Sequence, residues 1–345
     1  MKIAFIIASL EGYGGTNRVA TLLANGLSSH HDITIVSRYS LKNTYPLNDE
    51  VKDIKFTGNN LSFLWQCRQY IDDRSFDVVI IHTMSKLTPA LLLGGIKAKN
   101  VWSIEHISYD FHSFMYKQLR KKLYTKINKV ITLTQNDASN YKPFHNHVAV
   151  MVNPSSLSLK IDSTLTKKLT SKTLVSIGRL TYQKGYELLI KAWSLVEPLH
   201  SNWSLHLYGD GEDKEKLENL IASFNLQNIV LKGSTNDVQA VYDNAGFYIM
   251  SSRFEGLPVV LIEAQSRGLP IVSFDCPSGP AEIVHHGIDG ILVQNGNVLA
   301  LAEAMIHMIE NPQLRQTMAR EALQSAQTYH IDTVIDKWLA LLADA

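Results

Sequence analysis

Short apolar runs alternate with amphipathic segments along the whole chain, and this alternation constrains the fold more than any other feature. Such runs are typical of buried parallel strands, and the intervening segments repeat their apolar residues at helical spacing. The pattern predicts an α/β protein with doubly wound parallel sheets, one in each half. The expected strands cover residues 3–8, 33–37, 78–82, 101–105, 130–134, 148–152, 174–177, 204–208, 229–232, 247–250, 271–274 and 291–293. The expected helices cover 16–28, 61–72, 87–98, 111–127, 185–196, 214–224, 238–244, 258–267, 281–286, 298–309 and 333–342.

The length of 345 residues indicates two domains, because single cores seldom grow beyond about 250–300 residues. The segment 153–171 is rich in Ser, Thr, Lys and Pro and has no clear period, so we expect the interdomain linker there. We therefore expect one Rossmann-like domain over residues 1–155 and a second over 170–330. Ligands of open parallel sheets collect at the carboxyl ends of the strands, so two such domains would face each other across a binding cleft.

Composition excludes several classes of protein. The net charge of +1 gives no general case for nucleic-acid binding. Cys67 and Cys276 have neither metal-ligand spacing nor the pattern of a disulfide framework, which fits a reducing cytosol. The apolar N-terminus is interrupted by Glu11 and Gly12, so we expect a first strand there rather than a signal peptide. No apolar run reaches the roughly 18 residues that a membrane span needs.

The stretch 251–264 carries the strongest local signal for a binding site. It follows an expected strand and places Glu255 in a turn, after which a helix is expected to start at Pro258 and to contain Glu263. Gly268 and Pro270 end that helix. Exposed N–H groups at such a helix start, at the carboxyl edge of a sheet, bind phosphates and sugars. A single Glu263 could equally be an ordinary paired helix charge.

Further strand ends carry groups suited to a diphosphate. Arg179 and Lys184 flank a helix start after Gly178, although either residue alone would be read as a solvated surface charge. Gly209 permits close approach of a ligand or simply a tight turn, and the backbone around Ser234 could read a base edge. Ser278 and Gly279 could frame another helix start beside the cleft, or form a plain Pro-Gly turn.

In the first half, a glycine loop with Gly14 and Gly15 follows the first strand. Asn17 stands where the dinucleotide fingerprint needs its last glycine, which argues against NAD. His106 ends an expected strand at the cleft edge, where a functional role competes with an ordinary structural one. The helix 111–127 has a basic face, usually just solvated, and we take as a hypothesis that it meets an anionic membrane surface. That face includes Lys117, Arg120 and Lys121.

Together these motifs resemble the retaining glycosyltransferases of the GT-B fold, in glycosyltransferase family four. The spacing of Glu255 and Glu263 matches the family's Glu-x7-Glu motif, and Gly178-Arg179 with Lys184-Gly185 matches its diphosphate loop. The Cys-Pro-Ser-Gly-Pro segment 276–280 is similar to one in enzymes of bacterial surface-polysaccharide synthesis. The resemblance implies an acceptor-binding first domain, to which the last helix (331–345) returns, and a donor-binding second domain.

The resemblance also implies the roles of individual residues. Arg179 and Lys184 would hold the diphosphate of a UDP-hexose or UDP-N-acetylhexosamine, and Glu263 would accept hydrogen bonds from the ribose. His106 would lie near the sugar and the acceptor, which would be a glycan or a lipid-linked saccharide. The residues implied around the donor sugar and diphosphate are Glu255, Phe254, Gly256 and Leu257, with Gly14 and Gly15 above the diphosphate.

No Asp-x-Asp motif is present, and two fixed cations reduce the need for a metal, so no metal or other cofactor is expected. The alternatives that remain are a nucleotide-sugar epimerase of the same architecture and a non-catalytic nucleotide-sugar-binding subunit.

Overall fold

A computed structural model describes the chain from residue 1 to 345 except residues 13, 40–42, 85 and 160–169. The predicted linker 153–171 therefore lies partly outside the described residues. The chain divides into two compact units, which are described separately below. The first comprises Met1–Ser156 and Ile331–Ala345, and the second comprises Leu157–His330.

The first unit contains a parallel sheet of seven strands in the order β3-β2-β1-β4-β5-β6-β7. The predicted Rossmann-like sheet is thus confirmed. The edge strand β3 was not predicted, because its sequence KDIKF is half-exposed and lacks an apolar run. The strands are β1 (Lys2–Ile7), β2 (Asp32–Arg38), β3 (Lys52–Phe56), β4 (Val78–Thr83), β5 (Val101–Glu105), β6 (Lys129–Thr132) and β7 (Val148–Val150).

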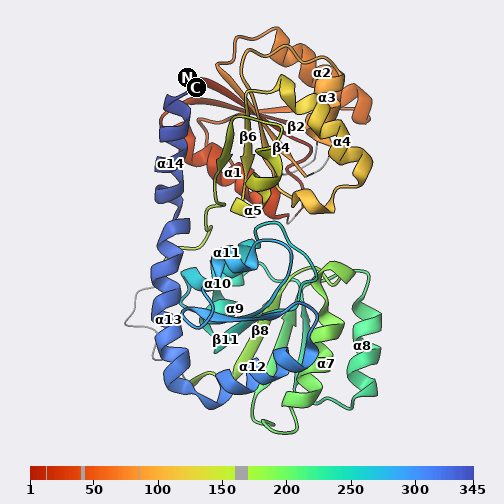
Figure 1. Cartoon of the computed structure of the whole chain (residues 1–345), viewed down its shortest axis with the longest axis vertical. Helices are drawn as coiled ribbons and strands as arrows, with labels where there is room; N and C mark the ends of the chain where they lie inside the picture. The colour runs from red at the N-terminus through yellow and green to blue at the C-terminus, as the bar shows by residue number, and fades with distance from the viewer. Residues whose placement is uncertain (13, 40–42, 85, 160–169) are drawn as a thin grey trace. The chain divides into compact units, whose positions relative to one another are not determined.

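Helices cover both faces of this sheet (Figure 1). On one face, α2 (Asn60–Asp72), α3 (Leu87–Leu93) and α4 (Phe114–Leu123) bury a shared apolar core against the strands. Tyr141 of α5 (Gln135–Tyr141), the helix that follows β6, is part of the same core. On the other face, α1 (Gly15–Ser28) packs against α14 (Ile331–Ala343). A Cβ at Gly26 would lie 2.5 Å from the side chain of Ile335, so the glycine is what lets α14 approach α1.

The segment around α4 differs from the single helix expected over residues 111–127. The structure has a 3₁₀ helix η1 (Tyr109–Phe111), then α4, then a second 3₁₀ helix η2 (Tyr124–Lys126). Ser113 caps α4 by accepting a hydrogen bond from the Tyr116 N–H, which starts the helix three residues late. As a result Phe114 and Met115, two apolar residues of the expected helix, are 75% and 78% exposed.

Arg120 is not on the basic face to which the sequence pattern assigned it. Its side chain is fully buried and forms an ion pair of 2.8 Å with the Glu105 carboxylate, which ends β5. The same carboxylate accepts hydrogen bonds from the Tyr124, Tyr141 and Ser103 hydroxyls. Burial alone would raise the pKa of Glu105, but Arg120 and the hydroxyls of Tyr124 and Ser103 together bring it below its ordinary value.

The second unit contains six parallel strands in the order β10-β9-β8-β11-β12-β13, so the second predicted Rossmann-like sheet is also confirmed. The cleft between the two units stays a prediction. The strands are β8 (Thr173–Ile177), β9 (Ser204–Tyr208), β10 (Ile229–Gly233), β11 (Phe247–Met250), β12 (Ile271–Asp275) and β13 (Gly290–Gln294).

The helices of this unit enclose a second apolar core. Trp193 of α7 (Tyr186–Val196), Met305 of α12 (Val298–Glu310) and Leu217 of α8 (Lys214–Ser223) are buried in it. The helix α13 (Pro312–Ala326) was not predicted. The remaining helices are α9 (Val238–Asp243), α10 (Val259–Ser266) and α11 (Pro280–Ile283). Pro258 precedes α10 as its cap instead of being its first residue.

The buried pair predicts a specific stability difference. Arg120→Met should lower the free energy of unfolding by about 3–5 kcal/mol at neutral pH, because Glu105 would keep a buried charge without its cation. The pKa of Glu105 is lowered in the folded protein, so its stabilising effect is lost as pH falls through that value. The difference between variant and wild type should therefore shrink below about pH 4.

Urea denaturation at several pH values measures this. The exposed neighbour Lys121 provides the matched control, since Lys121→Met should change the free energy of unfolding by no more than about 0.5 kcal/mol. An equal loss in the two variants would contradict the assigned role of the pair.

Candidate active site

The strand order of the second sheet brings two loops together at its carboxyl edge. The order reverses between β8 and β11, and such a switch point leaves an opening above the strand ends. Lys184 lies in the loop after β8, and Glu255 lies in the loop after β11. Lys184 Nζ is 2.7 Å from Glu255 Oε1, and both side chains retain some solvent exposure. The structure therefore joins the predicted diphosphate loop to the predicted sugar-binding turn.

Hydrogen bonds hold the Glu255 carboxylate in place. Ser252 Oγ donates to Oε1 at 2.7 Å, and Gln183 Nε2 approaches Oε2 at 3.4 Å. The Glu255 N–H donates to the Pro277 carbonyl at 2.9 Å, and the Ser278 N–H donates back to the Glu255 carbonyl at 3.1 Å. The carboxylate therefore has a defined position before any ligand binds.

The loop after β12 supports this turn closely. Gly279 has φ 97°, and a Cβ there would lie 2.0 Å from the Gly256 carbonyl oxygen. Leu257, which follows in the turn, is buried, and Phe254 is half-buried. Ser278 Oγ is buried and has no hydrogen-bond partner among the described residues. These residues surround the backbone of the turn, and the Ser278 hydroxyl is free for a further contact.

The strand ends of β8, β9 and β10 are joined through their backbones. The Gly178 N–H donates to the Tyr208 carbonyl, and the Gly209 N–H donates to the Gly233 carbonyl, each at 2.9 Å. Gly209 has φ 144°, and a Cβ there would lie 1.9 Å from the Gly178 carbonyl oxygen. Glycine is therefore needed at position 209 because the segments after β8 and β9 pack closely together there.

Arg179 and Ser234 follow two of these strand ends and are exposed. Within the described part of the chain, Arg179 forms no salt bridge, whereas Lys184 does. Arg179 is therefore a solvent-facing cation in the same loop as Lys184.

Glu263 lies on α10 and is buried. The Tyr242 hydroxyl of α9 donates to Glu263 Oε2 at 3.1 Å. The two glutamates therefore have different partners, although they belong to one sequence motif.

The first unit places its predicted residues at the matching switch point of its own sheet, between β1 and β4. Gly14 and Gly15 are exposed at the start of α1, and Asn17 Nδ2 donates to the carbonyls of Glu11 and Gly12. The Asn17 side chain thus ties the loop to the start of α1, at the position where the dinucleotide fingerprint would have its last glycine. Thr16 Oγ1 lies 2.8 Å from Met84 Sδ, which connects the loop to the segment after β4.

His106 follows β5 and is nearly buried. Its Nε2 is 3.1 Å from Nδ1 of His82 on β4, and the two rings are stacked. Burial lowers the pKa of His106 to about 4, against the opposing effect of Glu105. His106 is therefore a neutral imidazole at neutral pH.

Sequence reasoning missed four of these neighbours: His82, Gln183, Ser252 and Tyr242. Gln183 and Ser252 flank recognised motif residues, so their chain positions were a usable signal. His82 and Tyr242 became partners only through strand pairing and helix packing, for which no local pattern existed.

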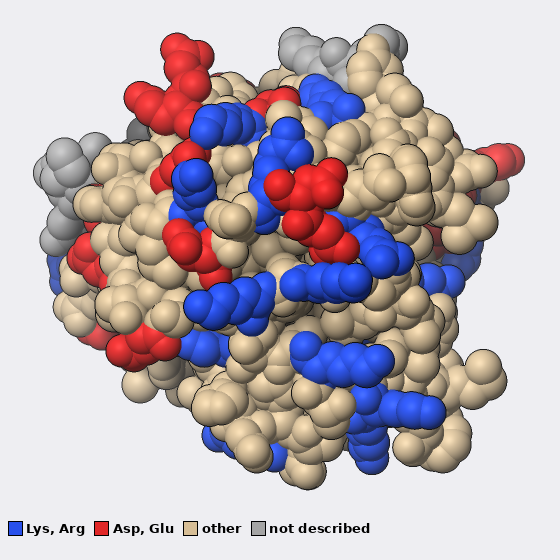
Figure 2. All heavy atoms as spheres, turned by 90° about the horizontal axis from the view of Figure 1, so that it is seen from above, with Lys and Arg blue, Asp and Glu red and all other residues tan. Residues whose placement is uncertain are grey.

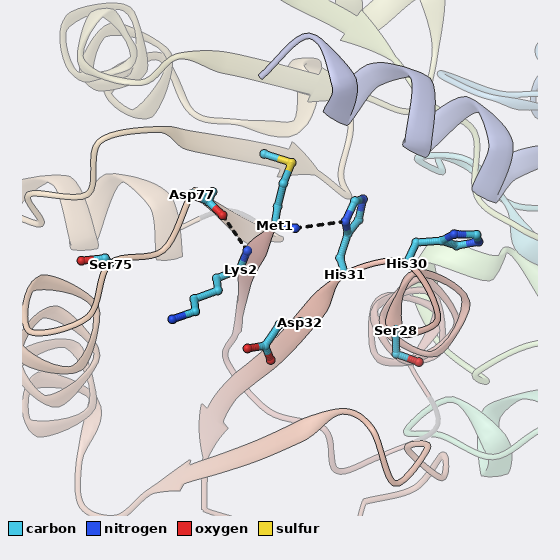
Figure 3. A pocket seen from close by; sticks show the side chains of 8 residues that line it. All are labelled: Met1, Lys2, Ser28, His30, His31, Asp32, Ser75 and Asp77. Atoms are coloured by element: carbon cyan, nitrogen blue, oxygen red, sulfur yellow. Dashed lines mark hydrogen bonds between the residues drawn. The ribbon is translucent and has the colours of Figure 1, made fainter.

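An open cavity of about 620 Å³ in the first unit is lined by none of these residues (Figure 3). Met1, Lys2 and Asp32 line it at the amino ends of β1 and β2. The Lys2 N–H donates to the Asp77 carboxylate there at 2.7 Å. Ligands of parallel sheets bind at the opposite edge, so we do not assign this cavity to the predicted site. Among the described residues, no group of three or more His, Cys, Asp or Glu side chains is arranged to hold a metal.

The close packing around Gly279 can be tested against a matched glycine. Gly279 and Gly296 both have positive φ, but a Cβ at Gly296 would meet no atom within 4 Å. Both alanine variants should pay about 1 kcal/mol for the strained backbone. Gly279→Ala should lose clearly more, because it must also displace the Gly256 backbone. Chemical denaturation of both variants measures the difference, and equal losses would contradict the role of this contact.

Comparison with known proteins identifies the family. The model described as Glycosyl transferases group 1 matches residues 159–325, and the model described as Glycosyltransferase Family 4 matches residues 13–154. The chain is 30% identical to the amylovoran biosynthesis glycosyltransferase AmsD of Erwinia amylovora, with 99% of each protein covered.

Two further proteins are similar over the full length. One, of Campylobacter jejuni, is an α-1,4-N-acetyl-D-galactosaminyltransferase named for an undecaprenol-diphosphate-linked saccharide, and it is 26% identical with 100% of this chain and 99% of that protein covered. The crystal structure of Anabaena Alr3699/HepE in complex with UDP has a TM-score of 0.83 at 17% identity, covering 100% of both chains, which shows a shared fold. The predicted family is confirmed: the chain belongs to the group 1 glycosyl transferases of glycosyltransferase family 4, and it is a glycosyltransferase.

Proposed function

We propose that this enzyme transfers a hexose or N-acetylhexosamine from a UDP-sugar to a glycan or lipid-linked saccharide, with retention, in the biosynthesis of a cell-surface polysaccharide. The observation that carries the proposal is the Lys184–Glu255 pair of 2.7 Å at the switch point of the second sheet. One member suits a diphosphate, the other suits sugar hydroxyls, and Arg179 adds a second cation in the same loop as Lys184.

The ion pair suggests how donor binding proceeds. A diphosphate entering beside Arg179 competes for the Lys184 ammonium, and the Glu255 carboxylate then accepts hydrogen bonds from the donor sugar. Ser252 and Gln183 keep Glu255 in position during this exchange of partners. The site is thus organised by its own charges before the donor arrives, which reduces reorganisation during the reaction.

In the proposed chemistry, the bond between the anomeric carbon and the UDP oxygen breaks, and UDP leaves with the electron pair. The acceptor oxygen forms its bond on the same face, and its proton passes to the departing phosphate oxygen. The negative charge that develops on UDP is stabilised by Lys184, Arg179 and the N–H groups at the start of α7. We expect transfer without a divalent metal, because these cations neutralise the leaving group.

The names of the relatives support a surface-polysaccharide acceptor. AmsD is named for amylovoran biosynthesis, and a 26% identical protein of Salmonella typhimurium is a lipopolysaccharide 1,6-galactosyltransferase. The Campylobacter protein is named for an undecaprenol-linked substrate, which supports a lipid-linked acceptor. We propose that the present enzyme works in the cytoplasm, at the inner face of the membrane.

The surface of α4 supports this location. Phe114 and Met115 are exposed at its start, and Lys121 and Lys122 are exposed toward its end. Lys117 is half-buried and lies 3.6 Å from Asp110, so it contributes less free charge. Figure 2 shows lysines and arginines gathered on one part of the face seen from above and mixed with acids elsewhere, so the basic surfaces are local. Within the described residues, no helix is long and apolar enough to span a bilayer.

The catalytic proposal predicts that Lys184→Ala and Glu255→Ala each lower turnover by at least about a hundredfold, since each removes a preplaced group. The assay follows UDP release with and without a saccharide acceptor, and circular dichroism checks that the variants fold. Lys216→Ala is the control, because Lys216 is an exposed lysine in the same unit.

Three outcomes of this assay would contradict the proposal. Near-normal turnover in either variant would remove that residue from the mechanism. Interconversion of the UDP-sugar without acceptor would indicate an epimerase, and binding without any turnover would indicate a non-catalytic subunit.

The membrane proposal predicts that the protein sediments with anionic vesicles more than with neutral ones, by roughly 1 kcal/mol for each nearby lysine. The double variant Lys121→Glu, Lys122→Glu should abolish this preference, and Phe114→Ser should weaken binding to both vesicle types. Leu199→Ser is the control, because Leu199 is an exposed apolar residue of the other unit. Equal sedimentation of the wild type on both vesicle types would refute the electrostatic attraction.

A further inference from the structure

The contact between His82 and His106 joins two imidazoles that are both buried in the first unit. Nδ1 of His82 and Nε2 of His106 are 3.1 Å apart, and the ring planes are inclined by 15°. The Phe5 ring packs against His82 at a centroid distance of 4.9 Å. The backbone N–H of His106 also donates to the Thr83 carbonyl at 2.9 Å, which fixes the main chain beside the ring. His82 therefore determines where the His106 ring can lie.

Both histidines are neutral at neutral pH. Burial and the neighbouring His106 lower the pKa of His82 well below its ordinary range, and burial lowers the pKa of His106 to about 4. The charged groups nearest in the network are Glu105 and Arg120, which pair with each other. A neutral imidazole carries one N–H, so in this contact one ring donates and the other accepts.

The environment of His82 Nε2, the ring nitrogen outside this contact, indicates which of the two rings donates. His82 Nε2 is buried and has no partner among the described residues. If His106 donated, His82 would carry its proton on Nε2, leaving a buried N–H donor unsatisfied. If His82 donates from Nδ1, its Nε2 is an unprotonated acceptor, and unsatisfied buried acceptors are better tolerated than unsatisfied donors. His106 then accepts at Nε2 and carries its proton on Nδ1.

We propose that His82 is a positioning residue that holds His106 as the Nδ1–H tautomer and so presents this N–H to the substrate. His106 then acts as a hydrogen-bond donor to a sugar or acceptor oxygen, and not as a base. The substrate contact rests on the proposed function, whereas the tautomer is a property of the unliganded protein. A free imidazole favours the Nε2–H tautomer, so the proposed state is one that the protein must impose.

The direct test is a long-range ¹H–¹⁵N spectrum of the full-length protein with ¹⁵N-labelled histidine, which reports the protonated nitrogen of each ring. Spectra of His82→Phe and His106→Phe assign the two residues. The expected result is an Nδ1–H pattern for both histidines in the wild type and an Nε2–H pattern for His106 in His82→Phe. An Nε2–H pattern for His106 in the wild type would overturn the proposal.

Turnover tests the positioning role. His82→Phe should lower kcat about tenfold, the value of one hydrogen bond, with little change in the KM of the donor. Asn places its amide near the Nδ1 position of His, whereas Gln places it near Nε2, so His82→Asn should retain more activity than His82→Gln. A purely structural His82 would lower the melting temperature of each variant without changing kcat or the His106 tautomer, and this result would refute the inference.

The two proposals can fail separately. Unchanged transfer in His106→Ala would remove His106 from the proposed function, while the spectrum would still decide the tautomer. A protein without transferase activity but with the Nδ1–H pattern would sustain the structural part of the inference alone.

Discussion

The parallel arrangement of the strands is the constraint on which the other features depend. In a parallel sheet every strand ends at the same edge, so each following loop starts there. Where the strand order reverses, two neighbouring loops diverge to opposite faces and leave an opening. In the second sheet these are the loops that carry Lys184 and Glu255. In the first sheet they are the glycine loop after β1 and the segment after β4.

Two ion pairs of similar geometry differ in how deeply they are buried, and this difference determines whether a ligand can reach them. The Glu105–Arg120 pair is sealed from solvent, and its carboxylate also accepts hydrogen bonds from the Tyr124 and Tyr141 hydroxyls, so it holds the end of β5 and the residue that follows it, His106. The Lys184–Glu255 pair has nearly the same separation but remains accessible. A ligand with its own charges can exchange with the second pair and cannot reach the first. The same chemistry thus supports the scaffold in the first unit and, in the proposed function, substrate binding in the second.

Several parts of the fold were predictable because they depend on local patterns. Central strands such as β4 and β11 are apolar throughout, since both of their faces are covered. The edge strand β3 escaped prediction because its exposed side needs no apolar residues. Around α4, the apolar repeat correctly predicted a helix but placed its start too early. The Ser113 cap starts the helix at Phe114, which is exposed.

The sequence by itself determined which residues follow the strands. His106 comes directly after one apolar run, Lys184 and Glu255 lie in the loops after two others, and these positions place all three at sheet edges. Only the tertiary structure decided which of these groups meet, because pairing across strands depends on the strand order and not on sequence separation. In the folded chain Glu255 forms an ion pair with Lys184, and Glu263 accepts a hydrogen bond from the Tyr242 hydroxyl. The tertiary structure also moved Arg120 from a presumed basic surface to a buried carboxylate, because the end of β5 offers an acid that no helical pattern can reveal.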